Sequence, residues 1–180
     1  MESTLDLPAI EDQQEFNLRR WREICADPAL NAIEGRVETD RFGQIIMTPS
    51  AGFSHSDFES DILTRLNALL SCGKARPECP ISTSGGVRAA DVAWISDERL
   101  KTALQENILV QAPEICVEVL SRSNTRNEIT EKKRLYFEGG AEEVWICDLN
   151  GGMHFFGRNT CDDELGASAI CPGFPERVSS

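Results

Sequence analysis

The sequence predicts one α/β or α+β domain in which helices pack against a mixed β-sheet. Apolar residues recur at helical spacing over residues 13–27 and 54–71, which indicates amphipathic helices. Short apolar runs of strand length lie between and after them, without the regular alternation of repeated βαβ units. A chain of 180 residues has room for one domain with a real core and little more. We therefore expect residues 1–180 to form a single domain.

The composition is typical of a globular protein, with 41% hydrophobic and 27% charged residues. No apolar run approaches the roughly 18 residues of a membrane span, and the acidic N-terminus lacks the features of a signal peptide. We therefore expect a cytoplasmic protein with no membrane partner. The seven cysteines form no Cys-x-x-Cys pair, so neither a zinc ribbon nor a thioredoxin-type site is expected.

The first half of the chain predicts a helix, two strands of a hairpin, a second helix, a loop and two more strands. In that order they cover residues 13–27, 30–40, 43–50, about 54–71, 72–80, 81–85 and 87–96. The first helix stops at Asp27-Pro28, and the hairpin turn falls in residues 39–43.

The second half predicts a loop with a helical turn, a strand, a helix, a buried strand and an edge strand. In that order they cover residues 97–108, 114–121, about 124–139, 143–148 and 153–157. Gly139-Gly140 ends the helix, because glycine readily adopts the positive φ of a helix C-terminus. From Arg158 the composition is loop-like, and residues 171–180 are predicted to form an irregular tail.

The net charge of -12 argues against nonspecific nucleic-acid binding unless the basic residues are clustered. One such cluster exists within residues 122–134, and it consists of Arg122, Arg126, Lys132, Lys133 and Arg134.

Glu118 lies in an otherwise apolar strand, where a carboxylate must face solvent or have a positive partner. Asp91 lies in another strand, and two acids on adjacent strands can share a cleft and bind a hard divalent cation. In the following helix, Glu128, Lys132 and Tyr136 share one face. Lys132 can reach the acids from there and stabilise an anionic transition state. On spacing alone, the simpler interpretation is solvated acids and a weak surface ion pair between Glu128 and Lys132.

The order of several short motifs favours the functional interpretation. Asp91 is followed by a Val-Glu-Val-x-Ser strand, a helix with an acid and a lysine four apart, and a Glu-x-Trp-x-x-Asp strand. The residues concerned are Asp91, Val117-Glu118-Val119-Leu120-Ser121, Ser123, Glu128, Lys132, Tyr136, Gly140, Glu143, Trp145 and Asp148. In this order they resemble the Uma-two family of endonucleases, formerly a domain of unknown function. That family looks like a branch of the PD-(D/E)XK nuclease superfamily, and the resemblance covers about residues 14–158.

The resemblance implies a restriction-endonuclease-like fold, with an N-terminal helix and hairpin beside the mixed sheet. It implies a metal-dependent endonuclease that hydrolyses phosphodiester bonds of nucleic acid, expected to be DNA, with Mg²⁺ or Mn²⁺. Asp91 and Glu118 become the metal-binding acids, with the carbonyl of Val119 as a third ligand. Lys132 becomes the catalytic lysine, displaced to the helix from the usual position, which is Leu120 here.

Three further residues have two interpretations each. Glu59 is either an additional helix-borne acid of the site or a solvated helix residue. Arg88 either contacts phosphate or neutralises the acids. His55 matches a family position, but we expect it to cap or pack rather than to catalyse. Ala90 replaces the usual proline before Asp91, which changes backbone shape more than chemistry.

An alternative function is a catalytically inactive nuclease fold that acts as a binding or interaction module. The net charge of -12 favours it, because only residues 122–134 offer a path for phosphates. We also expect homodimers. Superfamily nucleases that cut both strands often pair, and the apolar strand 153–157 at a sheet edge is suited to pairing or to being covered.

Overall fold

A mixed six-stranded β-sheet forms the centre of the molecule. The computed structural model describes residues 12–32, 34–48, 52–103 and 107–179. The strand order is β3-β4-β5-β6-β7-β8, and only β5 and β6 pair in parallel. The strands are β3 (Gly73–Thr83), β4 (Gly86–Ser96), β5 (Ile115–Val119), β6 (Glu143–Cys147), β7 (Met153–Gly157) and β8 (Glu164–Leu165).

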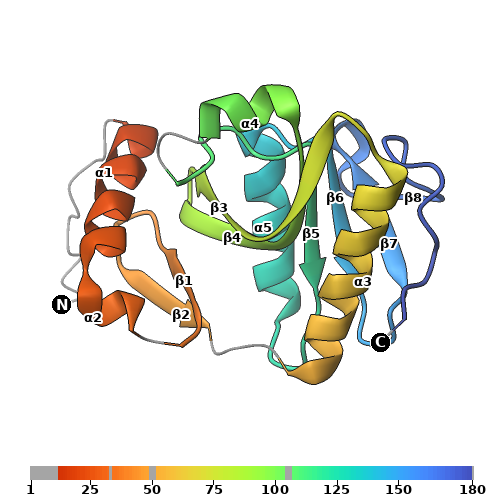
Figure 1. The fold of residues 1–180 in the computed structure, drawn as a ribbon, viewed down its shortest axis with the longest axis horizontal. Helices are drawn as coiled ribbons and strands as arrows, with labels where there is room; N and C mark the ends of the chain where they lie inside the picture. Colours follow the sequence, from red (N-terminus) through yellow and green to blue (C-terminus); the bar gives the residue numbers. More distant parts are fainter. Residues whose placement is uncertain (1–11, 33, 49–51, 104–106, 180) are drawn as a thin grey trace, which may run out of the picture.

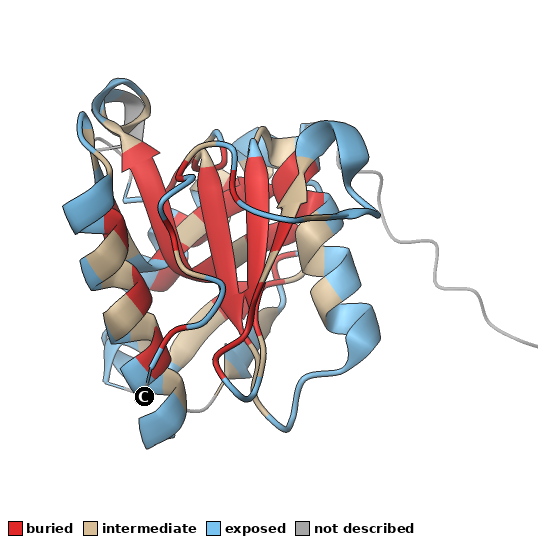
Figure 2. Cartoon of the chain, turned by 90° about the vertical axis from the view of Figure 1, so that its right-hand side faces the viewer, coloured by how far each residue is buried: buried red, intermediate tan, exposed pale blue. Residues whose placement is uncertain are grey.

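Two long helices cover opposite faces of this sheet. Alternate residues of the central strands pack against α3 (Phe53–Leu69) on one face and α5 (Arg126–Gly139) on the other. Val117 and Trp145, for example, belong to the core on the α3 side, and Cys116 and Val144 to the core on the α5 side. Figure 2 shows the central strands buried and the outward faces of the flanking helices exposed. The mixed sheet with flanking helices confirms the predicted fold class.

The N-terminal elements gather at one end of the molecule, where the long strands β3 and β4 reach out from the central sheet (Figure 1). They are α1 (Gln13–Ala26), α2 (Pro28–Asn31) and a hairpin of β1 (Arg36–Thr39) and β2 (Ile45–Thr48). Two backbone N–H groups of β4 donate hydrogen bonds to side chains of the hairpin. Val87 N–H donates to Thr39 Oγ1 at 2.9 Å, and Ala89 N–H donates to Glu38 Oε1 at 2.8 Å.

Several predicted elements were wrong. Residues 72–80, predicted as a loop, belong mostly to β3, which is an edge strand and therefore tolerates Pro77 and Pro80. Residues 97–108 begin with a helix, α4 (Asp97–Ala103). The strand predicted over 30–40 starts only at Arg36, after α2.

The strand 153–157 is not at the edge of the sheet, because β8 pairs with its outer side. A 3-10 helix, η1 (Arg158–Thr160), leads from β7 towards β8. Beyond β8 the chain is irregular, as predicted, yet it packs on the α3-side core through Cys171, Phe174 and Val178. The acidic lead over residues 1–11 lies outside the described residues. No helix among those that are described combines the length and the apolar character needed to cross a membrane.

Candidate metal centre

Two buried carboxylates from neighbouring strands lie at one cavity. Asp91 on β4 is 2% exposed and Glu118 on β5 is 3% exposed, and the two strands pair antiparallel with Val92 opposite Val117. Both line a cavity of about 500 Å³ whose other walls come from the hairpin, the start of α3, the loop after β5 and Glu78 of β3. The adjacent-strand placement that the sequence predicted thus brings the two acids to one cavity.

Glu118 is held by two side chains of α5. Lys132 Nζ lies 3.1 Å from Oε2, and the Tyr136 hydroxyl donates to Oε1 at 2.6 Å. Burial raises the pKa of Glu118 to about 7, although the charge of Lys132 opposes the shift. Helical spacing places Lys132 and Tyr136 on the same face, which is why both reach one carboxylate.

Lys132 is shared by a second acid, Glu38 of β1, whose Oε1 lies 3.0 Å from Nζ. Lys132 also donates to the carbonyl of Ala89 at 3.3 Å. Burial alone would lower the pKa of Lys132, but the neighbouring charges of Glu118 and Glu38 outweigh it and raise the pKa. The ammonium group is therefore held in its charged form between two buried carboxylates.

Asp91 has three partners from three different segments. Val119 N–H donates to Oδ2 at 2.7 Å, the Arg36 guanidinium binds Oδ1, and His55 Nε2 lies 3.6 Å from Oδ2. Burial opposes ionisation of Asp91, but His55, Arg36 and Lys132 outweigh it and lower its pKa. Asp91 therefore loses its proton more readily than Glu118.

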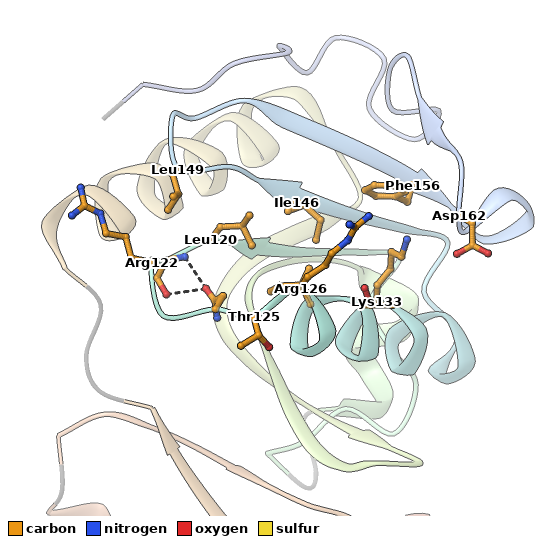
Figure 3. Close-up of a pocket in the computed structure, with 13 residues that line it drawn as sticks. Leu120, Arg122, Thr125, Arg126, Lys133, Ile146, Leu149, Phe156 and Asp162 are labelled. Carbon is orange, nitrogen blue, oxygen red and sulfur yellow. Dashed lines mark hydrogen bonds between the residues drawn. The ribbon is translucent and has the colours of Figure 1, made fainter.

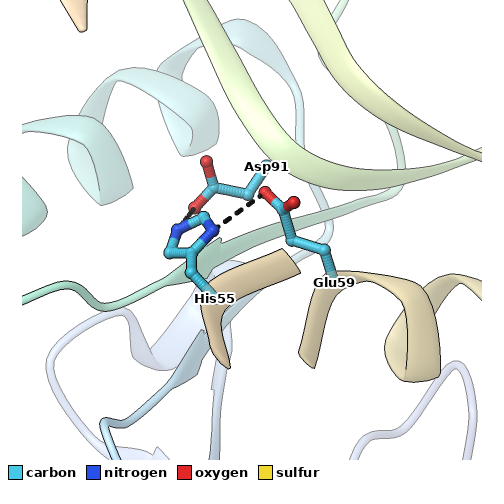
Figure 4. A group of neighbouring side chains, drawn as sticks. All are labelled: His55, Glu59 and Asp91. Atoms are coloured by element: carbon cyan, nitrogen blue, oxygen red, sulfur yellow. Dashed lines mark ion pairs between the residues drawn. The ribbon is translucent and has the colours of Figure 1, made fainter. Parts of the chain in front are cut away.

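His55 and Glu59, one turn apart on α3, face Asp91 across the cavity (Figure 4). One imidazole nitrogen and one oxygen from each acid lie within 4.8 Å of one another, close enough to hold a cation. His55 Nδ1 is 3.3 Å from Glu59 Oε1 but makes no hydrogen bond within the described residues. Contact with Asp91 and then Glu59 raises the pKa of His55 to about 10. A cation bound here would displace the proton of His55, because only the neutral imidazole coordinates a metal. The resulting set of one nitrogen and two oxygens suits Mn²⁺ as well as a harder cation.

The other candidate residues are placed differently. Glu128 turns away: its carboxylate accepts Thr125 N–H at 2.8 Å in a capping box at the start of α5. Arg88 lies 3.8 Å from Glu38 Oε2 and is not among the described residues that line the cavity, so it neutralises an acid rather than facing the cavity. Val119 lines the cavity, beside the two acids.

Arg36 and Glu38 are the functional candidates that the sequence did not reveal. They stand at i and i+2 in β1 and so point to the same side of the hairpin. The alternation of charged residues around Val37 was the only local sign of their role in the sequence, and it does not predict that β1 packs across β4. His55, expected to cap or pack, instead contacts two acids of the cavity.

The Glu-x-Trp-x-x-Asp motif has a structural role. Glu143 is buried and accepts hydrogen bonds from Trp145 Nε1 at 2.7 Å and Ser168 Oγ at 2.6 Å. It also accepts hydrogen bonds from the backbone N–H groups of Ala169 and Ile170. Asp148 accepts the N–H groups of Asn150 and Gly152 in the turn before β7. The motif thus anchors the C-terminal segment and shapes a turn, away from the cavity.

Comparisons with known proteins agree with this architecture. The chain resembles the crystal structure of a "putative nuclease belonging to DUF820" from Anabaena variabilis, with a TM-score of 0.66 and 16% identity. The match covers 84% of this chain and 92% of that one. A search of curated proteins gave no match. The model of the Uma2 family, described as "Putative restriction endonuclease", matches residues 26–167, most of the chain. The protein therefore belongs to the Uma2 family.

Proposed function

We propose that the protein is a metal-dependent endonuclease that hydrolyses phosphodiester bonds of DNA. The observation that carries the proposal is the pair of buried acids, Asp91 and Glu118, at one cavity with Lys132 bound to Glu118. Buried carboxylates at such a cavity are typical of functional sites, because structural acids are more often exposed. Family membership supports the same class of activity.

A single Mg²⁺ or Mn²⁺ fits these donors. Asp91 and Glu118, which line the same cavity, would hold it with the carbonyl of Val119 as a third ligand. The group whose ligand atoms lie within 4.8 Å of one another is His55, Glu59 and Asp91, so His55 and Glu59 would complete the site beside Asp91. Such a cation, when bound, polarises the phosphate and lowers the pKa of a water nucleophile. His55 Nδ1 makes no hydrogen bond among the described residues and lies 3.3 Å from Glu59 Oε1, so it could bind the cation once it has lost its proton.

The chain's own residues supply orientation and charge. Tyr136 and Lys132 fix the two oxygens of Glu118, so its carboxylate is oriented before any ligand arrives. Lys132 stabilises negative charge as it develops on the phosphate oxygens. Arg36, which pairs with Asp91 in this structure, would pair with the substrate phosphate once a cation neutralises Asp91.

Cleavage of supercoiled and linear DNA tests the proposal. We expect cleavage with Mg²⁺ or Mn²⁺ and none with Ca²⁺, which accepts looser geometry and supports binding better than hydrolysis. Glu118→Gln should abolish turnover while keeping the fold, and Lys132→Ala should lower the rate without removing Mn²⁺ binding. Glu131→Gln is the matched control, because Glu131 is exposed, pairs with Arg134 and does not line the cavity among the described residues. Full activity in Glu118→Gln would contradict the assignment.

A second candidate function is a non-catalytic binding module. It is favoured by the ion pairs that already neutralise the acids, since Arg36 binds Asp91 and Lys132 binds both Glu38 and Glu118. Calorimetric titration with Mn²⁺ separates the two functions. If the wild type binds Mn²⁺ and Glu118→Gln does not, the result supports the nuclease. If the wild type neither binds Mn²⁺ nor cleaves DNA or RNA, the result supports the binding module.

We further propose a cytoplasmic location and a homodimeric assembly. All seven cysteines are free in the structure, as expected in a reducing compartment. β7 is covered by β8, so pairing would use another surface, and the exposed Ile46 and Met47 of the hairpin strand β2 are the candidates. Light scattering at micromolar concentration should give the dimer mass, and a monomer would contradict this.

A further inference from the structure

A second cavity, of about 660 Å³, lies on the α5 side of the sheet (Figure 3). Its floor is apolar and combines Leu120 and Ile146 with Phe156 of β7 and Ile129 of α5. Both cavities are lined by Ser121 and Asn124, so the loop after β5 borders this cavity and the metal centre alike. The two are neighbouring parts of one surface, and a substrate strand at the metal centre can continue into the second cavity.

The rim of this second cavity is basic. Arg122 and Arg126 are exposed there and form no ion pair with any carboxylate in the part of the chain that is described. Lys133 Nζ lies 4.1 Å from the centroid of the Phe156 ring and donates to the carbonyl of Cys161 at 2.6 Å. Asp162 is the one acid among the lining residues. The rim is thus a local concentration of positive charge on a chain of net charge -12.

The basic cluster seen in the sequence is therefore divided by function. Lys132 is buried against Glu118, and Arg134 is bound by Glu131 at 2.7 Å and by Glu138 on the exposed side of α5. Only the remaining members, Arg122, Arg126 and Lys133, reach the second cavity. These are the cations left to meet phosphates.

We propose that this cavity binds a single-stranded stretch of the DNA substrate beside the scissile phosphate, an inference that rests on the proposed nuclease function. Exposed bases offer apolar faces that match Phe156 and Ile146, and their phosphates match the basic rim. A duplex keeps its base faces stacked inside, so the apolar floor would stay uncovered.

Fluorescence anisotropy with labelled oligo(dT) and a duplex of equal length, in Ca²⁺ to prevent cleavage, tests this inference. We expect oligo(dT) to bind more tightly than the duplex. The double variant Arg126→Ala/Lys133→Ala should weaken oligo(dT) binding about tenfold and lower the salt slope by about 1.4, because each contact to a single strand contributes about 0.7. Arg134→Ala, which removes one positive charge from the same helix, should change the affinity for oligo(dT) less than about twofold.

The apolar floor has its own variant and control. Phe156→Ser should weaken oligo(dT) binding about fivefold or more through lost stacking, with the salt slope unchanged. Phe42→Ser removes a partly exposed aromatic ring of the hairpin, remote from the cavity lining, and should bind as the wild type does.

The outcomes separate this inference from the nuclease proposal. Wild-type cleavage with unchanged oligo(dT) binding in the Arg126/Lys133 variant would overturn the cavity's role and leave the nuclease standing. Tighter binding of the duplex, or of oligo(U), would overturn single-stranded DNA as the occupant. A wild type that binds no nucleic acid and no Mn²⁺ would overturn both.

Discussion

At the scale of single residues, Glu118 is the most constrained group of the metal centre. Its two oxygens are bound by different side chains, Lys132 and Tyr136, and both come from one face of α5. A buried carboxylate oxygen that loses its donor has no water to replace it, so the loss costs more than that of an exposed hydrogen bond. The carboxylate is therefore oriented by the fold before any cation binds, which is what a preorganised site requires.

Tyr136→Phe tests this support directly. In the wild type we expect a loss of about 1–3 kcal/mol in the free energy of unfolding, because Glu118 Oε1 is left without a donor. In a Glu118→Met background, Tyr136→Phe should leave the free energy of unfolding unchanged or raise it, because the Tyr136 hydroxyl there already lacks its acceptor. Urea unfolding of the four proteins measures the difference as a double-mutant cycle. Equal costs in the two backgrounds would mean that the hydroxyl does not serve Glu118.

His55 gives the centre a pH dependence of known sign. Its pKa is raised from 6.5 to about 10, so its stabilisation is fully present below pH 6.5 and is lost as the pH rises towards 10. His55→Gln should therefore be less stable than the wild type at pH 6, and the gap should narrow by pH 10. Urea unfolding of both proteins between pH 6 and pH 10 measures this gap, and taking the difference between them removes the effect of other titrating groups. A gap that stays constant with pH would show that His55 is not held charged by Asp91 and Glu59.

At the scale of elements, local patterns predicted some parts of the structure and could not predict others. The helix α5 was predictable because its apolar face and its terminal glycines are local signals, and with it came the approach of Lys132 to Glu118. The contribution of β1 to the metal centre was not predictable, because Glu38 and Ala89, which form a hydrogen bond, are 51 residues apart in the sequence. That contact depends on packing of the hairpin on β4, which no short stretch encodes. The same limit applies to β3, whose prolines are compatible with a strand only because it lies at an edge.

The hairpin packs closely against β4 at Gly86, and we expect the packing to tolerate no side chain there. Gly86 has a φ of +106°, and a Cβ there would lie 2.3 Å from the carbonyl oxygen of Asp40. Gly86→Ala should therefore displace β1, lower stability by more than about 1 kcal/mol and weaken Mn²⁺ binding, since Arg36 and Glu38 move with the hairpin. Gly166→Ala is the control, because nothing lies within 4 Å of its Cβ position. Unfolding and calorimetry measure both effects; wild-type values in Gly86→Ala would show that the hairpin does not depend on this contact.

At the scale of the whole molecule, the metal centre joins segments from most of the chain. Four carboxylates, on β1, α3, β4 and β5, meet three basic side chains, on β1, α3 and α5. The acids are Glu38, Glu59, Asp91 and Glu118, and the basic residues are Arg36, His55 and Lys132. Because the acids already have partners, folding does not require a cation, in contrast to small domains that are unfolded without their metal. A bound cation should therefore add to stability rather than create it.

Thermal unfolding with Mn²⁺ measures this addition. A ligand that binds only the folded state at a hundred times its Kd stabilises it by about 2.7 kcal/mol. In a chain of 180 residues, each kcal/mol shifts Tm by about 2–4 °C, so we expect a rise of roughly 5–10 °C that EDTA reverses. Glu118→Gln should lose most of this rise because it removes one of the two principal ligands, whereas Glu131→Gln should keep it. An equal rise in Glu118→Gln would place the cation elsewhere on this acidic surface, and no rise in the wild type at any Mn²⁺ concentration would leave the centre without a metal role.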